Sequence, residues 1–269
     1  MWVTLPDNVD TSPDRAGICQ ISRVVPDEEP EVSTYSPSEI IWYRRCPYSY
    51  LLRKIWGFQP GLARELGYGK ALHHIMRLIG NEVKQGKKIS SAVAKEMVEE
   101  HFYLPYAPPA TAQAMKEPVT RKIARFIEDN MDDIERIQQV EARLEFRVGP
   151  ALVYGIVDVI LRHDGESFEA RDYKTTKADP YSDDEADFQI RLYSAGLKQM
   201  GYSISLASIA NLEEETIRKV DISKEVLSTT VDEAQGYILG IKSSNYTAKS
   251  GLYCRKCDYH DICRYCKLT

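Results

Sequence analysis

The chain lacks several features that would place it in other classes of protein. No apolar run reaches the ~20 residues of a membrane span, and residues 1–30 show no basic-then-apolar signal, so a cytoplasmic protein without a membrane partner is expected. The pattern G-x-x-x-x-G-K-[ST] is absent, which argues against a helicase or an ATPase. Positive charge is not in excess, because 35 Lys and Arg face 40 Asp and Glu and give a net charge of -5. A uniformly basic surface is therefore excluded, whereas a locally basic groove is not.

Cysteine is also scarce, but its few positions are unevenly spread. The chain has 6 cysteines, and most of them lie at the C-terminal end, from Cys254 to Cys266. In a cytosolic protein, such a tight cluster indicates metal ligation rather than disulfide bonds.

The 269 residues are enough for one large domain or for one domain with an appendage. Residues 1–33 contain several Pro and Asp without a clear period, and they predict an extended arm in which Cys19 is not expected to be a ligand. Residues 34–139 are predicted to form a helical portion, residues 140–245 a core that contains the strands, and residues 246–269 a cysteine-rich tail. The last three segments are expected to form one compact domain.

The first helix is predicted to begin at Pro37, because Ser36 can cap it and Glu39 completes a capping box. Cys46 and the proline that follows it interrupt this helix, and a second short helix is predicted over residues 50–55. Apolar residues at helical spacing predict further helices over residues 66–86, 90–104, 117–139, 185–200 and 223–242. Alternating or β-branched runs predict strands over residues 140–148, 152–161, 167–173, 204–210 and 216–222. This order of elements predicts a mixed α/β fold, with a central mixed sheet and flanking helices.

Acidic residues and a lysine gather in the predicted strands. Asp158 follows Gly155 in a G-x-x-D pattern and enters an apolar strand, whereas Asp172 and Lys174 end the next strand. Two aspartates on adjacent strands can converge on a hard cation such as Mg²⁺ or Mn²⁺, which prefers carboxylate oxygens. Lys174 lies on the same face as Asp172, because side chains two apart in a strand point the same way. An ammonium there can orient an attacking water or stabilise charge that develops on a phosphate.

Two further patterns complete a set. Gln189 and Tyr193 lie one turn apart on the next predicted helix and share a face, and His73 follows Gly69 in a G-x-x-x-H pattern upstream. The order G-x-x-D, D-x-K and Q-x-x-x-Y, with this upstream histidine, resembles the RecB-like branch of the PD-(D/E)XK nucleases. The resemblance implies a restriction-endonuclease-like core at residues 140–245, with the histidine in the helical portion before it.

The resemblance also implies site residues. The implied metal ligands are His73, Asp158, Asp172 and the Tyr173 carbonyl. Lys174 would be the catalytic lysine, and Gln189 and Tyr193 would position DNA or that lysine.

Two models fit the cysteines. In the first, Cys46, Cys254, Cys257 and Cys263 bind a [4Fe–4S] cluster that clips the tail onto the N-terminal helices; one distant cysteine plus C-x2-C-x5-C resembles the AddB-type and the CRISPR-associated Cas-four nucleases. In the second, Cys254, Cys257, Cys263 and Cys266 bind Zn²⁺. The first model is favoured, because Cys46 and the nuclease motifs occur as a set.

DNA is the expected partner, as single strands or overhanging ends. Candidate phosphate-binding residues are Arg44, Arg45, Arg53, Lys54, Lys70, Lys84, Lys87, Lys88, Arg121 and Lys122. Candidate base-stacking residues are Tyr43, Tyr48, Tyr50 and Trp56.

The leading functional prediction is a Mg²⁺- or Mn²⁺-dependent exonuclease that trims DNA ends in CRISPR adaptation, beside an integrase complex. One alternative is a RecB- or AddB-like nuclease of recombination or repair, chromosomal or phage-borne. Another is a non-catalytic DNA-binding scaffold with a structural iron–sulfur or zinc site.

Overall fold

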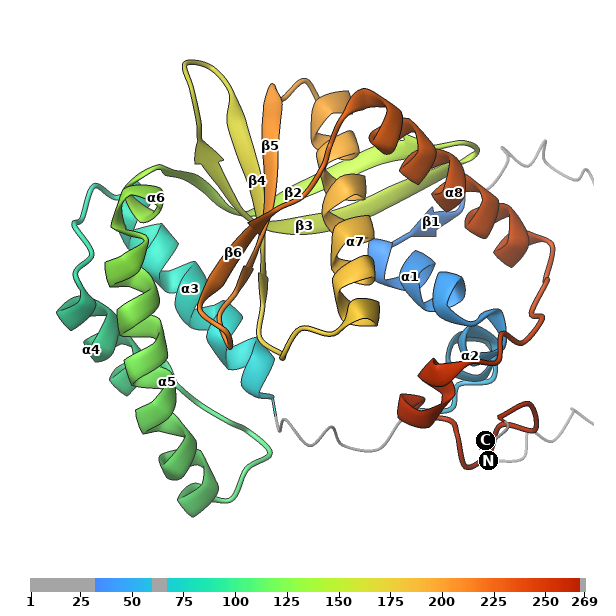
Figure 1. Cartoon of the computed structure of the whole chain (residues 1–269), viewed down its shortest axis with the longest axis horizontal. Helices are drawn as coiled ribbons and strands as arrows, with labels where there is room; N and C mark the ends of the chain where they lie inside the picture. Colours follow the sequence, from blue (N-terminus) through green and yellow to red (C-terminus); the bar gives the residue numbers. More distant parts are fainter. Residues whose placement is uncertain (1–31, 60–66, 267–269) are drawn as a thin grey trace, which may run out of the picture. The chain divides into compact units, whose positions relative to one another are not determined.

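The computed structural model describes residues 32–59 and 67–266. Nearly all of the arm predicted over residues 1–33, Cys19 included, lies outside this part. From Val32 onward the described residues form one compact unit, in which a central sheet has helices on both faces (Figure 1). Within that part of the chain, no helix is both long and apolar enough to cross a membrane.

The strands are β1 (Thr34–Tyr35), β2 (Ile137–Val148), β3 (Ala151–Arg162), β4 (Phe168–Lys174), β5 (Ile204–Asn211) and β6 (Thr216–Lys219). The helices are α1 (Pro37–Arg45), α2 (Pro47–Tyr50), α3 (Tyr68–Lys84), α4 (Ser91–His101), α5 (Pro109–Asp129), α6 (Met131–Glu135), α7 (Pro180–Gln199) and α8 (Lys224–Lys242). A π-helical turn (Leu51–Ile55) extends α2, and a 3-10 turn (Leu252–Lys256) lies in the tail.

The sheet is mixed, as the sequence predicted. Its six described strands follow the order β1-β3-β4-β5-β6, with β2 paired to β3. β2 and β3 form a long antiparallel hairpin, β4 runs antiparallel to β3 and parallel to β5, and β6 closes the described sheet antiparallel to β5. The two-residue strand β1, which the sequence did not predict, pairs in parallel with the start of β3.

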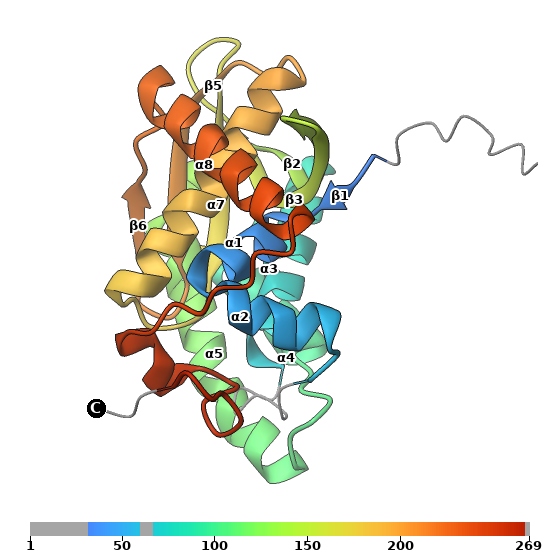
Figure 2. The same ribbon diagram turned by 90° about the vertical axis from the view of Figure 1, so that its right-hand side faces the viewer.

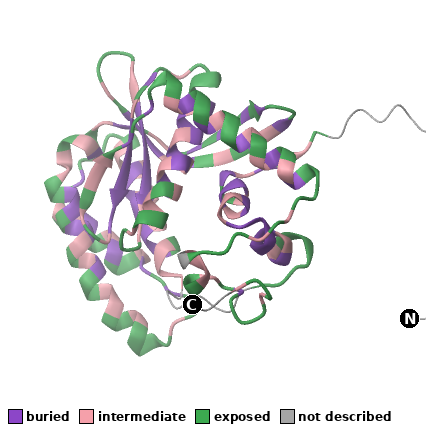
Figure 3. Ribbon diagram, turned by 45° about the vertical axis from the view of Figure 1, so that its right-hand side comes forward, coloured by how far each residue is buried: buried purple, intermediate pink, exposed green. Residues whose placement is uncertain are grey.

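The sheet separates two apolar cores. Helices α3, α4, α5 and α6 lie on one side of it, and α1, α7 and α8 lie on the other (Figure 1). β4 contributes to both cores, since five consecutive residues of this strand are buried, and the middle of the sheet is accordingly purple in Figure 3. A strand buried on both faces fixes the position of the residues at its end, which are Asp172 and Lys174.

The ends of several elements differ from the prediction. The capping box at Ser36 is present, but the helix expected over 117–139 is wrong at both ends: it begins at Pro109 and stops at Asp129. A proline at the first helical position needs no hydrogen-bond partner for its nitrogen, so Pro109 can start this helix, and residues 102–108 separate it from α4. After the short α6, strand β2 already begins at Ile137.

The C-terminal tail lies against α1 and α2 (Figure 2). The Tyr265 ring packs edge-on against Tyr48, with 4.8 Å between ring centroids. The Tyr259 hydroxyl donates to the Phe58 carbonyl at 3.1 Å, and the Lys249 ammonium donates to a carbonyl of α1 at 2.9 Å. Segments about 200 residues apart in the sequence are thus joined by side-chain contacts.

Candidate active site

Helix α3 brings a histidine to the sheet. Gly69, in its first turn, lies so near the end of β4 that a β-carbon there would approach Thr175 Oγ1 to 2.8 Å. This close approach places His73, one turn later, beside β3, where its Nδ1 lies 3.0 Å from Asp158 Oδ1. The glycine of the G-x-x-x-H pattern therefore allows the helix to reach the strands.

Asp158 is held from two sides. Its Oδ1 contacts His73, and its Oδ2 accepts a hydrogen bond of 2.8 Å from the backbone N–H of Tyr173. The last pair in the β3–β4 ladder is Val159 opposite Arg171, so Asp158 and Asp172 occupy the next facing positions. The two aspartates predicted to act together therefore lie across from one another where the two strands separate.

Asp172 is almost completely buried, with 4% of its surface exposed. Its Oδ2 lies 2.8 Å from the Lys174 ammonium, but the same oxygen accepts no aligned hydrogen bond among the described residues. Burial raises the pKa of Asp172, and the neighbouring ammonium opposes that increase without cancelling it. A buried carboxylate oxygen without a hydrogen bond is an uncommon feature, and a bound cation would satisfy it.

Gln189 and Tyr193 fix the lysine from the other side. The Lys174 ammonium donates to Gln189 Oε1 at 2.8 Å, and the Gln189 amide nitrogen donates to the Tyr193 hydroxyl, also at 2.8 Å. The Tyr193 ring packs against Gly155, where a β-carbon would lie 2.7 Å from its Cε1. The glycine of the G-x-x-D pattern thus makes room for the tyrosine that supports the glutamine.

The two adjacent histidines of α3 have different surroundings. Burial lowers the pKa of His73, but the hydrogen bond and charge of Asp158 outweigh burial, so the net shift is upward. His74 faces away from Asp158, with its Nδ1 2.6 Å from an Arg77 guanidinium nitrogen. Burial, together with Arg77, lowers the pKa of His74.

The donor types fit a hard divalent cation, since two carboxylates, an imidazole and a nearby backbone carbonyl are available. Even so, no three His, Cys, Asp or Glu side chains in the described residues are gathered closely around one point in the way that metal ligands are. Asp158 is engaged by His73 and by a backbone N–H, and Asp172 faces Lys174. All seven residues predicted for the site nonetheless lie along these contacts: His73, Asp158, Asp172, Tyr173, Lys174, Gln189 and Tyr193.

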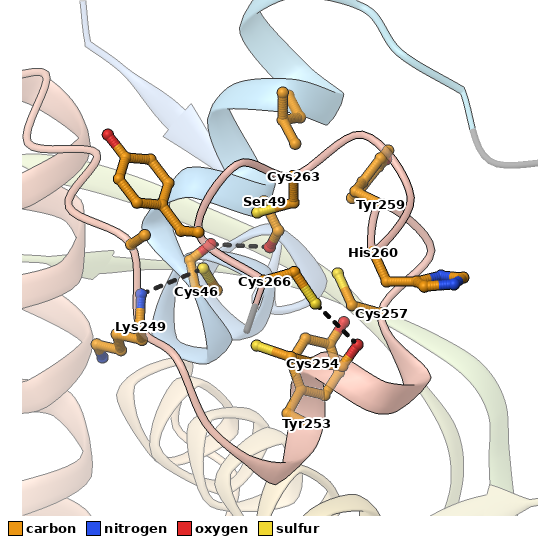
Figure 4. Close-up of a pocket in the computed structure, with 13 residues that line it drawn as sticks. Cys46, Ser49, Lys249, Tyr253, Cys254, Cys257, Tyr259, His260, Cys263 and Cys266 are labelled. Carbon is orange, nitrogen blue, oxygen red and sulfur yellow. Dashed lines mark hydrogen bonds between the residues drawn. The ribbon is translucent and has the colours of Figure 1, made fainter. Parts of the chain in front are cut away.

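A second candidate site lies in the tail. Cys46, at the junction of α1 and α2, lines one pocket together with Cys254, Cys257, Cys263 and Cys266 (Figure 4). All five thiols are free, so no disulfide links them. Cys46 is buried, and its sulfur accepts the Lys249 N–H at 3.5 Å.

The pocket contains the cysteines of both ligand models. Burial raises the pKa of Cys257, and the neighbouring Cys46 and Cys263 add to that increase. The Cys266 thiol points toward the Cys254 carbonyl at 3.8 Å. The cluster model requires Cys46 to lie beside the tail cysteines, as it does, but Cys266 lines the same pocket, so the geometry leaves the zinc model open.

Several side chains predicted to contact DNA instead contact other residues of this protein. Arg44 and Arg45 bind Asp184 and Glu185 of α7, which begins at Pro180, before the predicted start of this helix at residue 185. The rings predicted to stack bases are also largely enclosed: Tyr43, Tyr48 and Tyr50 are each less than 7% exposed. Among the four, Trp56 alone is open to solvent, at 54%.

Two solved structures are similar to this chain. A protein from Eubacterium rectale, named as a candidate exonuclease, is similar with a TM-score of 0.50 and 14% identity, over 88% of this chain and 91% of that chain. The structure of SSO0001 gives a TM-score of 0.42 and 15% identity, over 86% of each chain. No curated protein matches the chain.

A family model decides the relationship. The model for the PD-(D/E)XK nuclease superfamily matches residues 34–264, which run from β1 into the cysteine-rich tail. The match contains His73, Asp158, the D-x-K pattern at Asp172 and the Q-x-x-x-Y pattern at Gln189. This chain therefore belongs to the PD-(D/E)XK nuclease superfamily.

Proposed function

We propose that the protein is a metal-dependent deoxyribonuclease that processes DNA ends. The observation that carries this proposal is the position of Lys174, whose ammonium lies 2.8 Å from both a buried Asp172 oxygen and Gln189 Oε1. A lysine fixed between a carboxylate and an amide, at the point where two strands separate, is suited to act on a phosphate bound there.

Asp158, Asp172, His73 and the Tyr173 carbonyl would hold Mg²⁺ or Mn²⁺. When bound, such an ion lowers the pKa of its water and polarises a phosphoryl oxygen. The His73 contact and the Tyr173 N–H orient the Asp158 carboxylate, and burial keeps Asp172 in a fixed position.

The protein's own groups supply the remaining chemistry. The Lys174 ammonium would orient the attacking water or stabilise the negative charge that develops on the phosphate. Gln189 holds this ammonium in place, and Tyr193 in turn holds the glutamine amide. Gln189 and Tyr193 are thus positioning residues for the lysine.

The cysteine pocket is proposed to hold a [4Fe–4S] cluster on Cys46, Cys254, Cys257 and Cys263. Ligation by Cys46, between α1 and α2, and by three cysteines of the tail would join segments far apart in the sequence, and the binding free energy would add to folding stability. Zinc held by the four tail cysteines is the alternative. The meeting of Cys46 with the tail in one pocket supports the cluster.

The cellular setting rests on the motif resemblance alone. The cysteine spacing supports trimming of DNA ends in CRISPR adaptation, beside an integrase complex. A RecB- or AddB-like role in recombination or repair is the competing setting. The name of the Eubacterium rectale protein is in keeping with end processing in either one.

The test is cleavage of end-labelled single- and double-stranded DNA with Mg²⁺ or Mn²⁺. Asp158→Ala and Lys174→Ala should abolish cutting, whereas Asp232→Ala and Lys95→Ala, which change exposed residues of α8 and α4, should not. Cutting that persists without Asp158 and Lys174 would contradict the proposed site. DNA binding without cutting by any of the proteins would favour the non-catalytic scaffold.

A further inference from the structure

An open groove begins at His73. Its lining residues are Gly69, Lys70, His73, His74, Arg77 and Glu141. Lys70, His73 or His74, and Arg77 follow one another at intervals of three or four along α3, so they share one helical face. On a protein with a net charge of -5, this face adds cationic side chains directly beside the proposed catalytic residues.

Arg77, which lines this groove, has two partners there. Its guanidinium lies 3.4 Å from Glu141 and 2.6 Å from His74 Nδ1. Val140 pairs with Val159 and the next pair joins residues 142 and 157, so Glu141 occupies the position facing Asp158. Arg77 is therefore held one strand away from a predicted metal ligand.

The β2–β3 hairpin, which supplies Glu141 to this groove, also has large apolar side chains that are open to solvent. Ile156 is 49% exposed and Tyr154 is 50% exposed, whereas Val153 before them and Val157 after them are fully buried. Residues two apart in a strand share a face, so Ile156 and Tyr154 point to the same side, opposite the face on which Gly155 packs against Tyr193 of α7. Large apolar side chains left open in such a row, leading to a reactive site, indicate a binding surface.

The hairpin adds one more cation to this surface. Arg143 pairs across from Ile156, and Glu145 pairs across from Tyr154. Tyr154 lies four residues from Asp158, or ~13 Å along the strand, a length that about four stacked nucleotides span. The surface thus combines cations near the reactive site with an aliphatic and an aromatic side chain beyond it.

We propose that this surface binds single-stranded DNA, with the backbone along Lys70 and Arg77, with one base stacked on Tyr154 and another in apolar contact with Ile156; the proposal rests on the proposed nuclease function. Sites for single strands combine a cationic groove with rings on which bases stack, and they bind with little sequence preference. A paired duplex offers its backbone but not its base faces. The surface is therefore expected to select unpaired ends.

The test measures binding separately from cleavage. In EDTA, fluorescence anisotropy would compare a labelled oligonucleotide with the same strand annealed to its complement. Tyr154→Ala should weaken single-strand binding by about 5- to 150-fold, the range for loss of one stacked base, and Tyr154→Phe should restore it. Arg77→Ala should reduce the slope of log K against log salt by about 0.7, as for one lost phosphate contact. Tyr103→Ala, which changes a tyrosine that is 72% exposed after α4, should have no effect.

Each outcome separates the binding surface from the nuclease. If the protein cleaves DNA, Tyr154→Ala should raise KM for single strands while kcat is kept. If nothing is cleaved, the binding measurements still decide whether the surface holds DNA. Unchanged single-strand affinity in Tyr154→Ala and Arg77→Ala overturns the proposal. A change in oligomeric state by light scattering, without a change in DNA affinity, also overturns it and assigns the surface to a second copy of the chain.

Discussion

The contact between Gly155 and Tyr193 allows a sharp prediction. In Gly155→Ala, the new β-carbon would lie 2.7 Å from Tyr193 Cε1, whereas non-bonded carbons normally approach to about 3.5 Å. The ring must therefore move by close to 1 Å, although it is buried with only 5% exposed. Overpacking of this kind costs about 1–3 kcal/mol, which urea unfolding would measure as a lower midpoint with an unchanged slope.

The same displacement should reach the proposed chemistry. The Tyr193 hydroxyl accepts from Gln189, and Gln189 holds Lys174, so a moved ring withdraws support from the ammonium. A misplacement of about 1 Å can lower activity ~100-fold. DNA cleavage should therefore fall far more than the loss of stability would explain, because most of the Gly155→Ala protein stays folded.

Two further variants make this reasoning refutable. Gly236→Ala in α8 adds a β-carbon with nothing within 4 Å, so it should leave activity intact and stability equal or higher by up to ~1 kcal/mol. In a Tyr193→Ala background the clash is gone, so Gly155→Ala should cost little more stability. If Gly155→Ala were as stable and active as the wild type, or equally costly in both backgrounds, the steric argument would be wrong.

Three other predictions concern different parts of the molecule. Under the cluster model, Cys46→Ala should abolish the broad visible absorption of anaerobically purified protein and Cys266→Ala should retain it; a colourless, zinc-loaded wild type would contradict that model. Arg171→Leu should destabilise the protein by about 3–5 kcal/mol in urea, because it removes the cation that is paired with the buried Glu169 carboxylate, and a loss below 1 kcal/mol would show that this ion pair adds little. Burial favours a higher pKa for Asp133, but Arg171 holds this pKa below 3.8. The ionised Asp133 carboxylate therefore stabilises the fold above that pH, and this contribution is lost as the pH falls through the lowered pKa. Asp133→Asn should make the free energy of unfolding less dependent on pH in the acid range, and an unchanged dependence would refute the assignment.

The strands and the site motifs could be read from the sequence because they depend on local patterns. Alternation and β-branching predicted β2, β3 and β4 to within three residues at each end, since each strand has at least one buried face. The G-x-x-D and D-x-K patterns predicted facing carboxylates because adjacent strands place them together. Their ligand and catalytic roles stay predictions.

Other features depend on partners distant in the sequence. Arg44 and Arg45 looked like DNA contacts, but α7 supplies Asp184 and Glu185 to bind them. The sequence did not predict that Tyr154 and Ile156 are exposed, because the strand pattern alone does not say which face of the sheet a helix covers. The available signal was that both faces of β3 carry large apolar residues, although one of these faces lacks a covering helix near Tyr154.

The bond between Arg45 and α7 links the two candidate sites mechanically. Arg45 directly precedes Cys46, and it grips Glu185 through two guanidinium nitrogens while also donating to Tyr253, which lines the cysteine pocket. Glu185 lies one helical turn before Gln189, the residue that holds Lys174. Any displacement of Cys46 would therefore act, through Arg45 and Glu185, on the helix that holds Gln189 against Lys174.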